Sequence, residues 1–322
     1  MASKALSLGI DTSNYKTSVA LTDSSGHILL DLRSFLRVKK GERGLRQSAA
    51  FFQHVQKLPD FITQALAEDE VRRRIGCIAV SDRPRPKEGS YMPVFIAGRA
   101  FAETLSAALN VPLFCFSHQE GHVEAVRYFA QVDEKQPYIC FHFSGGTSEA
   151  LLIDRKHGRF DIVGGSKDLA YGQVLDRLGV ALGYDFPCGQ ELDALALSAE
   201  GEEQFFSPVK VSDCFVNLSG LESQGQRLLA ADSFSEPKRR QRLAAALLDR
   251  LAASVCEMCC QLHEKYGVTT FIFAGGVSAS EYMKKYLRAR LTGCFTLIFG
   301  DPALAADNAV GISLLGGKKL WL

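Results

Sequence analysis

The chain has 322 residues, of which 47% are hydrophobic, and it carries 37 lysines and arginines against 36 aspartates and glutamates. This length exceeds a single compact core and favours two lobes of about 100–200 residues each. The near-zero net charge argues against a strongly basic nucleic-acid-binding protein, and no apolar run reaches the ~18–20 residues of a membrane span. The N-terminus lacks the layout of a secretory signal, so we expect a cytoplasmic protein with no membrane partner.

The first residues predict a β-meander. An apolar strand ends at Asp11, a polar turn follows, and the strand-like segments TSVALT and ILLDL are separated by the turn DSSGH. Helices are then expected at about 45–67, 89–109 and 117–130, and they alternate with the strand-like segments RIGCIAVS and VPLFCFS.

A second β-meander, YICFHFSGGTSEALLID, repeats the first. SGGTSEALLID matches SNYKTSVALTD with one residue deleted, and each stretch enters a glycine-containing turn and a third strand. The strands TTFIFAGG and TLIFG follow later, among helices. These helices are expected near 168–182, 189–199, 239–266 and 278–291, with a last one from about 306.

Two meanders, each followed by alternating helices and strands, predict an α/β protein of two similar lobes with mixed sheets. This is the plan of the duplicated actin-like ATPase fold (ASKHA, ribonuclease H-like), which binds its nucleotide in an interlobe cleft. We expect an N-terminal lobe over residues 1–132, with about 296–322 packing back on it, and a C-terminal lobe over 133–295.

Three loops have the composition of a nucleotide site. The loop Ser144–Thr147 suits a phosphate, because its glycines permit close backbone approach and its N–H and hydroxyl groups donate hydrogen bonds. The segment FAGGVSAS ends a strand and opens a helix, where an anion is favoured. Asp11 ends a strand and could orient a magnesium ion or a water. Each feature taken alone also fits an ordinary turn.

Two histidines predict a metal site. The segment FSHQEGHVEA places His118 and His122 four residues apart in an expected helix, so both imidazoles lie on one face and can reach one metal ion. Two ligands do not complete a site. Asp307, in DPALAADNAVG, is the candidate third ligand, and it fits a helix N-cap equally well.

Six motifs carry a resemblance to a known family. They occur in the order HQEGH, SGGTSEALL, VLDRLGVALGYDFPCGQELD, NLSGLES, FAGGVSAS and ADNAVG. From about residue 5 to 316 the chain resembles the TsaD-type tRNA threonylcarbamoyltransferases, once called glycoproteases or O-sialoglycoprotein endopeptidases (peptidase M22-like). The resemblance implies an iron or zinc ion held by His118, His122 and Asp307. It also implies transfer of a threonylcarbamoyl group from an adenylate to N6 of an adenosine in tRNA.

The resemblance further implies binding of an adenine nucleotide: ATP, ADP or an acyl-AMP. Phosphates are expected near Ser144–Thr147, and the nucleoside is expected between Asp176, Gly189 and Gly275–Ser280, with Gly275 and Gly276 at the strand-to-helix turn. The implied partners are tRNA and either a TsaB-like homologous subunit or a second copy of the chain. The residues that match the family's substrate contacts are Ser144, Gly145, Gly146, Asp176, Gly189 and Ser280.

The chain departs from the family pattern near the acyl-transfer chemistry. The family's first loop carries an acidic pair, and here the aligned positions hold Tyr15 and Lys16. A glycine-proline loop of the family is replaced by SDRPRP, which contains Arg83 and Arg85, and SGGTS lacks the family's histidine. The resemblance therefore implies a divergent member, in which Asp11 and Lys16 are the candidate catalytic residues.

Four functions remain open from the sequence. The first is a metal-dependent carbamoyl- or acyl-transferase, and the second is a non-catalytic paralogue or scaffold that binds nucleotide and metal. A metallopeptidase is disfavoured because the residue after the first histidine is Gln119, where a zincin needs glutamate as its general base. A sugar-kinase-like phosphotransferase is disfavoured because no sugar-site pattern is visible.

Overall fold

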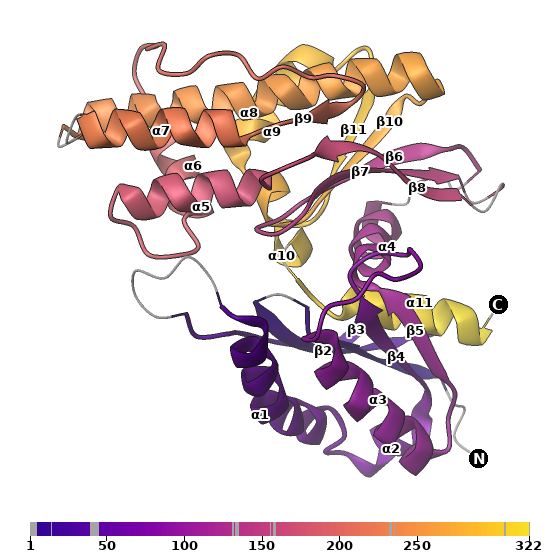
Figure 1. The fold of residues 1–322 in the computed structure, drawn as a ribbon. Helices are drawn as coiled ribbons and strands as arrows, with labels where there is room; N and C mark the ends of the chain where they lie inside the picture. Colours follow the sequence, from indigo (N-terminus) through magenta and orange to yellow (C-terminus); the bar gives the residue numbers. More distant parts are fainter. Residues whose placement is uncertain are drawn as a thin grey trace. The chain divides into compact units, whose positions relative to one another are not determined.

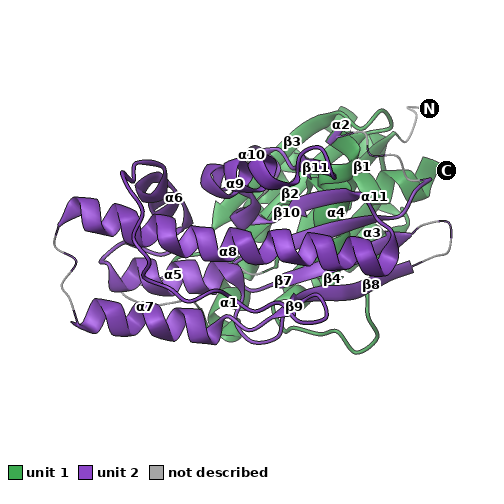
Figure 2. Ribbon diagram, turned by 90° about the horizontal axis from the view of Figure 1, so that it is seen from above, with its two compact units in different colours: residues 1–37, 45–129, 306–322 green, residues 38–44, 130–305 purple. Residues whose placement is uncertain are grey.

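The structure is a computed structural model of the whole chain. It describes residues 5–13, 15–38, 45–130, 132, 135–154, 156, 159–231, 234, 236–305 and 307–321. The chain forms two compact units (Figure 2). Unit 1 contains residues 1–37, 45–129 and 306–322, and unit 2 contains residues 38–44 and 130–305.

Unit 1 is built on a five-stranded mixed sheet of order β3-β2-β1-β4-β5. β1, β2 and β3 form the antiparallel meander, and β4 and β5 continue the sheet parallel to β1. The strands are β1 (Leu6–Asp11), β2 (Lys16–Asp23), β3 (Ile28–Phe35), β4 (Ile75–Arg83) and β5 (Leu113–Ser117).

The two faces of this sheet differ in what covers them (Figure 1). Alternate side chains of β1, among them Leu8 and Ile10, join the core beneath α1 (Gln47–Ala65) and α3 (Phe95–Leu109). The opposite face carries α11 (Val310–Trp321), whose backbone approaches closely: a Cβ on Gly9 would lie 2.5 Å from the Ala309 carbonyl oxygen. The remaining helices of unit 1 are α2 (Asp69–Arg74) and α4 (His118–Ala130).

Unit 2 repeats the scheme with a six-stranded sheet of order β11-β10-β6-β7-β8-β9. Stacked phenylalanines fill its core, with the rings of Phe141 and Phe273 5.3 Å apart. The strands are β6 (Tyr138–Phe143), β7 (Ser148–Asp154), β8 (Arg159–Ser166), β9 (Phe215–Val216), β10 (Thr270–Ala274) and β11 (Thr296–Phe299). The helices are α5 (Tyr171–Ala181), α6 (Gly189–Leu197), α7 (Ser219–Ala231), α8 (Pro237–Tyr266), η2 (Gly276–Ala279), α9 (Glu281–Leu291) and α10 (Pro302–Ala305).

The duplication read from the sequence is present in the sheets. The order β3-β2-β1-β4-β5 of unit 1 corresponds strand by strand to β8-β7-β6-β10-β11 of unit 2. One boundary differs from the expectation, because β11 pairs with β10 through Thr270 and Thr296 and so belongs to unit 2. The chain returns to unit 1 at residue 306 rather than at about 296. Among the described residues, no helix has the length and apolar character that crossing a membrane would require.

Candidate functional site

The helix that carries both histidines begins with a capping box. Ser117 precedes α4, and its backbone N–H and its hydroxyl both donate to Glu120 Oε2 at 2.7 Å. The Ser117 hydroxyl also accepts from the Glu120 N–H, at 3.2 Å. These reciprocal bonds satisfy donors that the first turn leaves open and fix where the helix starts. The sequence signal for this cap is the S-x-x-E spacing in SHQE.

His118 and His122 meet on the buried side of α4. Their Nε2 atoms lie 3.0 Å apart, and their rings cross at 84° with centroids separated by 4.4 Å. Both side chains are buried. The helical spacing therefore produces the convergence of imidazole nitrogens that the sequence predicted.

Asp307 reaches the histidines because α4 and α11 cross at two glycines. A Cβ on Gly311 would lie 1.8 Å from the Gly121 carbonyl oxygen, so only glycine permits this approach. Asn308 starts α11 by accepting from the Val310 N–H at 3.0 Å. Asp307 immediately precedes this cap and so lies beside α4. Gly121, Gly311 and Asn308 are positioning residues that the sequence reasoning missed.

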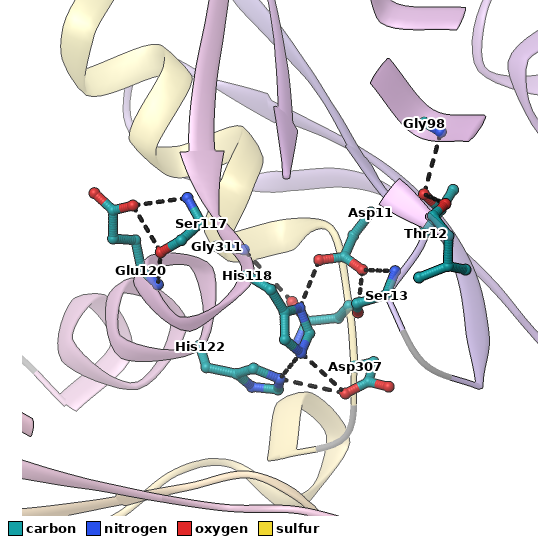
Figure 3. A network of polar contacts seen from close by, with 12 residues as sticks. Asp11, Thr12, Ser13, Gly98, Ser117, His118, Glu120, His122, Asp307 and Gly311 are labelled. Atoms are coloured by element: carbon teal, nitrogen blue, oxygen red, sulfur yellow. Dashed lines mark hydrogen bonds and ion pairs between the residues drawn. The ribbon is translucent and has the colours of Figure 1, made fainter. Parts of the chain in front are cut away.

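Three ligand atoms form a nearly equilateral triangle (Figure 3). Asp307 Oδ1 lies 3.3 Å from His122 Nε2 and 3.4 Å from His118 Nε2, and the two nitrogens are 3.0 Å apart. A tetrahedral ion with bonds of about 2.0–2.1 Å has ligand atoms about 3.3 Å apart. Two imidazoles and one carboxylate thus fit three corners of such an ion, and the fourth corner is left for a water or a substrate.

Asp11 holds the first imidazole in place. Its Oδ2 lies 2.8 Å from His118 Nδ1, and its Oδ1 accepts from the Ser13 N–H at 2.8 Å and from the Ser13 hydroxyl. A carboxylate on Nδ1 directs the other nitrogen, Nε2, toward the triangle. The carboxylate is committed to these partners, so in this structure Asp11 orients the His118 imidazole.

The two histidines hold their protons differently. Burial alone would lower the pKa of His118, but Asp11 and then Asp307 outweigh it and raise this pKa to about 10. Burial and the charge of His118 lower the pKa of His122. The folded protein thus favours a proton on His118 over one on His122, and a metal ion at this cluster would have to displace it.

Lys16, the other candidate catalytic residue, begins β2 and is buried. Its ammonium lies 4.3 Å from the centroid of the Phe35 ring and forms no ion pair with a described carboxylate. Burial lowers the pKa of Lys16, and the charge of Asp307 acts in the opposite direction. The Lys16 ammonium therefore stays over Phe35 and interacts with Asp307 through charge, without an ion pair.

In unit 2 the loop between β6 and β7 folds around its own serine. The Ser144 hydroxyl accepts from the Gly146 N–H at 3.3 Å and the Thr147 N–H at 3.1 Å. Both N–H groups converge on one point, which is the arrangement that an oxyanion needs. Gly275 adjoins this loop, because a Cβ there would lie 2.4 Å from the Phe143 carbonyl oxygen.

Asp176 lies beside the same loop. A Cβ on Gly145 would be 3.8 Å from Asp176 Oδ2, and the Cys188 N–H donates to Asp176 Oδ1 at 2.8 Å. Gly189 follows Cys188 as the first residue of α6. Burial raises the pKa of Asp176 to about 6 despite the Cys188 hydrogen bond. The structure thus brings Ser144–Thr147, Asp176, Gly189 and Gly275 together within unit 2.

Two other predicted contacts have structural partners. Ser280 caps α9 by accepting from the Met283 N–H at 3.1 Å, and its hydroxyl donates to Asp193. Gly276 is the first residue of η2. In the SDRPRP loop, Arg83 lies 2.6 Å from Asp82 and 3.9 Å from Glu120, so the guanidinium has acidic partners of its own.

Solved structures share the fold of this chain. Full-length HypF in its phosphate- and nucleotide-bound form aligns with a TM-score of 0.62 at 13% identity, over 100% of this chain and 47% of HypF, so the chain spans about half of that protein. The activator of 2-hydroxyisocaproyl-CoA dehydratase from Clostridium difficile, with bound ADPNP, aligns with a TM-score of 0.57 at 16% identity, over 98% and 95% of the two chains. The neighbours are actin-like ATPase folds, which confirms the predicted fold class.

Sequence relatives cover nearly the whole chain. The tRNA N6-adenosine threonylcarbamoyltransferase of Neorickettsia sennetsu is 26% identical over 319 residues, which are 98% of this chain and 94% of the relative. That of Dictyoglomus turgidum is 28% identical over 327 residues, 97% and 92% of the two chains. The family model described as TsaD, tRNA N6-adenosine threonylcarbamoyltransferase, matches residues 38–314. The chain therefore belongs to the TsaD family of tRNA N6-adenosine threonylcarbamoyltransferases.

Proposed function

We propose that this chain is a metal- and nucleotide-binding transferase homologue that moves a threonylcarbamoyl or related carbamoyl group, with tRNA adenosine as the acceptor. The observation that supports it most is the triangle of His118, His122 and Asp307. Two imidazoles and a carboxylate suit iron or zinc better than magnesium, which prefers oxygen ligands.

The chain's own residues divide the work in this proposal. His118, His122 and Asp307 hold the ion, and Asp11 fixes the orientation of His118. When bound, the ion supplies Lewis-acid polarisation of a carbonyl or phosphate oxygen. In unit 2, the N–H groups of Gly146 and Thr147 bind phosphate oxygens in exchange for the Ser144 hydroxyl, to which both donate in this structure. Asp176 and Gly189 bind the nucleoside.

Metal loading of the purified protein tests the centre. We expect His122→Ala to lose the iron or zinc measured by elemental analysis, while cooperative urea unfolding persists. His27→Ala is the matched control, because His27 lies at an exposed turn and pairs with Asp23. Equal metal content in His122→Ala and the parent protein would refute the assignment.

Calorimetry with ATP, ADP and AMP tests the nucleotide part. We expect binding by the parent protein, and weaker binding after Gly145→Val because the added side chain fills the space between the loop and Asp176. Gly220→Ala is the control, because its Cβ would meet no atom within 4 Å. A complete absence of heat and of thermal shift at millimolar nucleotide would contradict this part, since even a Kd of about 1 mM corresponds to ~4 kcal/mol.

A non-catalytic role is the second candidate, and Lys16 favours it. An ammonium near Asp307 cannot act as a carboxylate base or hold a second cation. We therefore expect the chain alone to transfer weakly in an assay with threonine, bicarbonate, ATP, the carbamate-forming synthase and tRNA. Activity restored by cell lysate would indicate a partner, such as a TsaB-like subunit. Robust transfer without lysate would refute the non-catalytic role.

The geometry gives no support to peptidase activity. Glu120, the acid nearest in sequence to the first histidine, directs its carboxylate to the Ser117 backbone and hydroxyl. It acts as the cap of α4 and is not directed at the triangle of ligand atoms (Figure 3).

A further inference from the structure

Unit 2 contains a hollow that the proposed function does not use. It lies among α6, α8 and α9, which contact one another, and residues 201–205 also line it. Its volume is about 780 Å³, within the ~300–1,000 Å³ of ligand pockets. We call it the α8–α9 pocket. None of its lining residues is among those proposed for metal or nucleotide.

Small residues create the space. α8 contributes Ala245 and Ala246, and α6 and the following turn contribute Ala196 and Ala199. Elsewhere α8 packs with leucines, as at Leu247 and Leu251. Alanines between three packed helices leave room that larger apolar side chains would fill.

The walls carry several cations, and two of them, Arg250 and Arg290, also act on the Asp249 carboxylate of the same pocket. The Arg290 guanidinium lies 3.5 Å from the centroid of the Tyr286 ring, and stacking leaves the N–H groups in its plane available. Arg250 donates through Nε to the Phe206 carbonyl at 2.9 Å, and this bond leaves its two terminal amino groups to donate to a ligand. Within the described residues, Arg250, Lys285 and Arg290 form no ion pair.

Two of the pocket's acidic groups are already compensated. Glu203 lies 3.6 Å from Arg242 and 3.9 Å from Arg239. Asp249 accepts from the Tyr282 hydroxyl at 3.0 Å, and burial raises the pKa of Asp249. The third acidic group is Glu202, so four cations of the lining face three acidic groups and one positive charge is in excess.

We propose that the α8–α9 pocket binds a small aromatic anion, in which a planar ring carries a phosphate or carboxylate group. The ring packs on the alanine floor between Tyr282 and Tyr286. The anionic group meets Lys285 and Arg290 through charge-assisted hydrogen bonds. This site is separate from the proposed function and does not depend on it.

Calorimetry with phenyl phosphate as the probe tests the proposal. We expect one molecule bound per chain, much weaker binding of phenol, and weaker binding of inorganic phosphate. Benzoate distinguishes whether a carboxylate substitutes for the phosphate. Lys285→Gln and Arg290→Gln should each weaken phenyl phosphate binding about tenfold.

Arg288→Gln is the matched control. Arg288 lies on the same helix but stacks on Phe299 at 5.1 Å, outside the pocket, so its variant should bind like the parent protein. An equal loss in Arg288→Gln would show a diffuse charge effect and overturn the proposal. No binding of phenyl phosphate at ten-millimolar concentration would also overturn it. His122→Ala should keep the pocket intact, which separates this result from any failure of the metal centre.

Discussion

The first loop places opposite charges close to one ligand set. Asp11 orients His118, whereas Lys16 brings an ammonium toward Asp307 and holds it over Phe35. The carboxylates favour a cation in the triangle and the ammonium opposes one. In the proposed metal centre, affinity would therefore be a balance that one residue can shift.

Lys16→Met should tighten metal binding. Methionine keeps an unbranched side chain over Phe35 while removing a positive charge. At an effective dielectric of about 20, a unit charge even ~12 Å from a cation corresponds to roughly tenfold in affinity, so we expect a gain of about tenfold or more. Competition against a chromogenic chelator measures the change. Lys57→Met is the control, because Lys57 also lies over a phenylalanine, Phe61 at 4.9 Å, but on α1. Unchanged or weaker affinity in Lys16→Met would contradict this balance.

Asp176 should make stability depend on pH. Its folded pKa of about 6 is higher than the ordinary value of 3.8, so the folded protein holds this proton more tightly than the unfolded chain. Stability falls as pH rises between about 4 and 6, and the penalty above pH 6 is on the order of 1–3 kcal/mol.

Asp176→Asn should remove that penalty, since an amide oxygen can still accept from the Cys188 N–H. Urea unfolding is expected to show the variant more stable than the parent at pH 7.5 and equal to it near pH 4. Its nucleotide affinity should fall, which would identify a group retained for binding at a cost in stability. A constant difference at both pH values would rule out titration of this group as the cause.

At the scale of elements, the crossing of α4 and α11 decides whether Asp307 can reach the histidines. The crossing depends on Gly121 and Gly311, whose backbones touch. Gly311→Ala should force the helices apart and cost about 1–3 kcal/mol of unfolding free energy, as overpacking does. It should also weaken metal binding, because a ligand displaced by an ångström no longer fits the ion.

Gly220→Ala in α7 provides the comparison, since open space surrounds that position. It should leave stability unchanged or raise it by up to about 1 kcal/mol. The test measures the free energy of unfolding in urea and the metal affinity of Gly311→Ala and Gly220→Ala in parallel. Equal behaviour of the two variants would show that the crossing does not limit the site.

Periodic, apolar elements were predictable and glycine-interrupted ones were not. The sequence indicated α8 and the strands of both meanders, because apolar spacing of 3.6 or 2 is explicit there. It did not indicate α7, whose Gly220 and Gly225 lower helix propensity. Gly225 packs directly against Leu178 of α5. A Cβ at residue 225 would lie only 2.4 Å from Leu178 Cδ2, so this packing requires glycine. That contact is tertiary and leaves no local pattern.

The candidate site was predictable in its ligands and not in its supports. Spacing and resemblance indicated His118, His122 and Asp307, which the structure brings together. The close approach of Gly121 and Gly311 joins segments far apart in sequence, and no periodicity encodes it. Ser280 is a predicted contact residue whose hydroxyl already has two partners within the fold. It accepts from the Met283 N–H in the α9 cap and donates to Asp193.

At the scale of the whole molecule, unit 1 is discontinuous. Its sheet is covered on one face by α11, where Ile312 and Leu315 pack with Ala79 and Phe116. A chain that ends at residue 305 should therefore bind no metal and should expose this face. Hydrogen exchange is expected to show lost protection in β1 and β4 and kept protection in β6 and β10.

Asp307→Asn in the full chain separates the two effects of that truncation. It should lose metal while β1 and β4 keep their protection, because α11 remains in place. If β1 and β4 stay protected in the truncated chain, α11 is not needed for the folding of unit 1.

The return of the chain to unit 1 sets an order of events during synthesis. A ribosome makes both histidines early and then makes residues 130–305, the larger segment of unit 2, before Asp307. At about 5–20 residues per second this interval lasts roughly 9–35 s. During it the newborn protein has an uncovered sheet face that a chaperone can recognise. If the proposed metal centre forms, its insertion can be completed only on a finished chain, so a prematurely terminated product would be left without the ion.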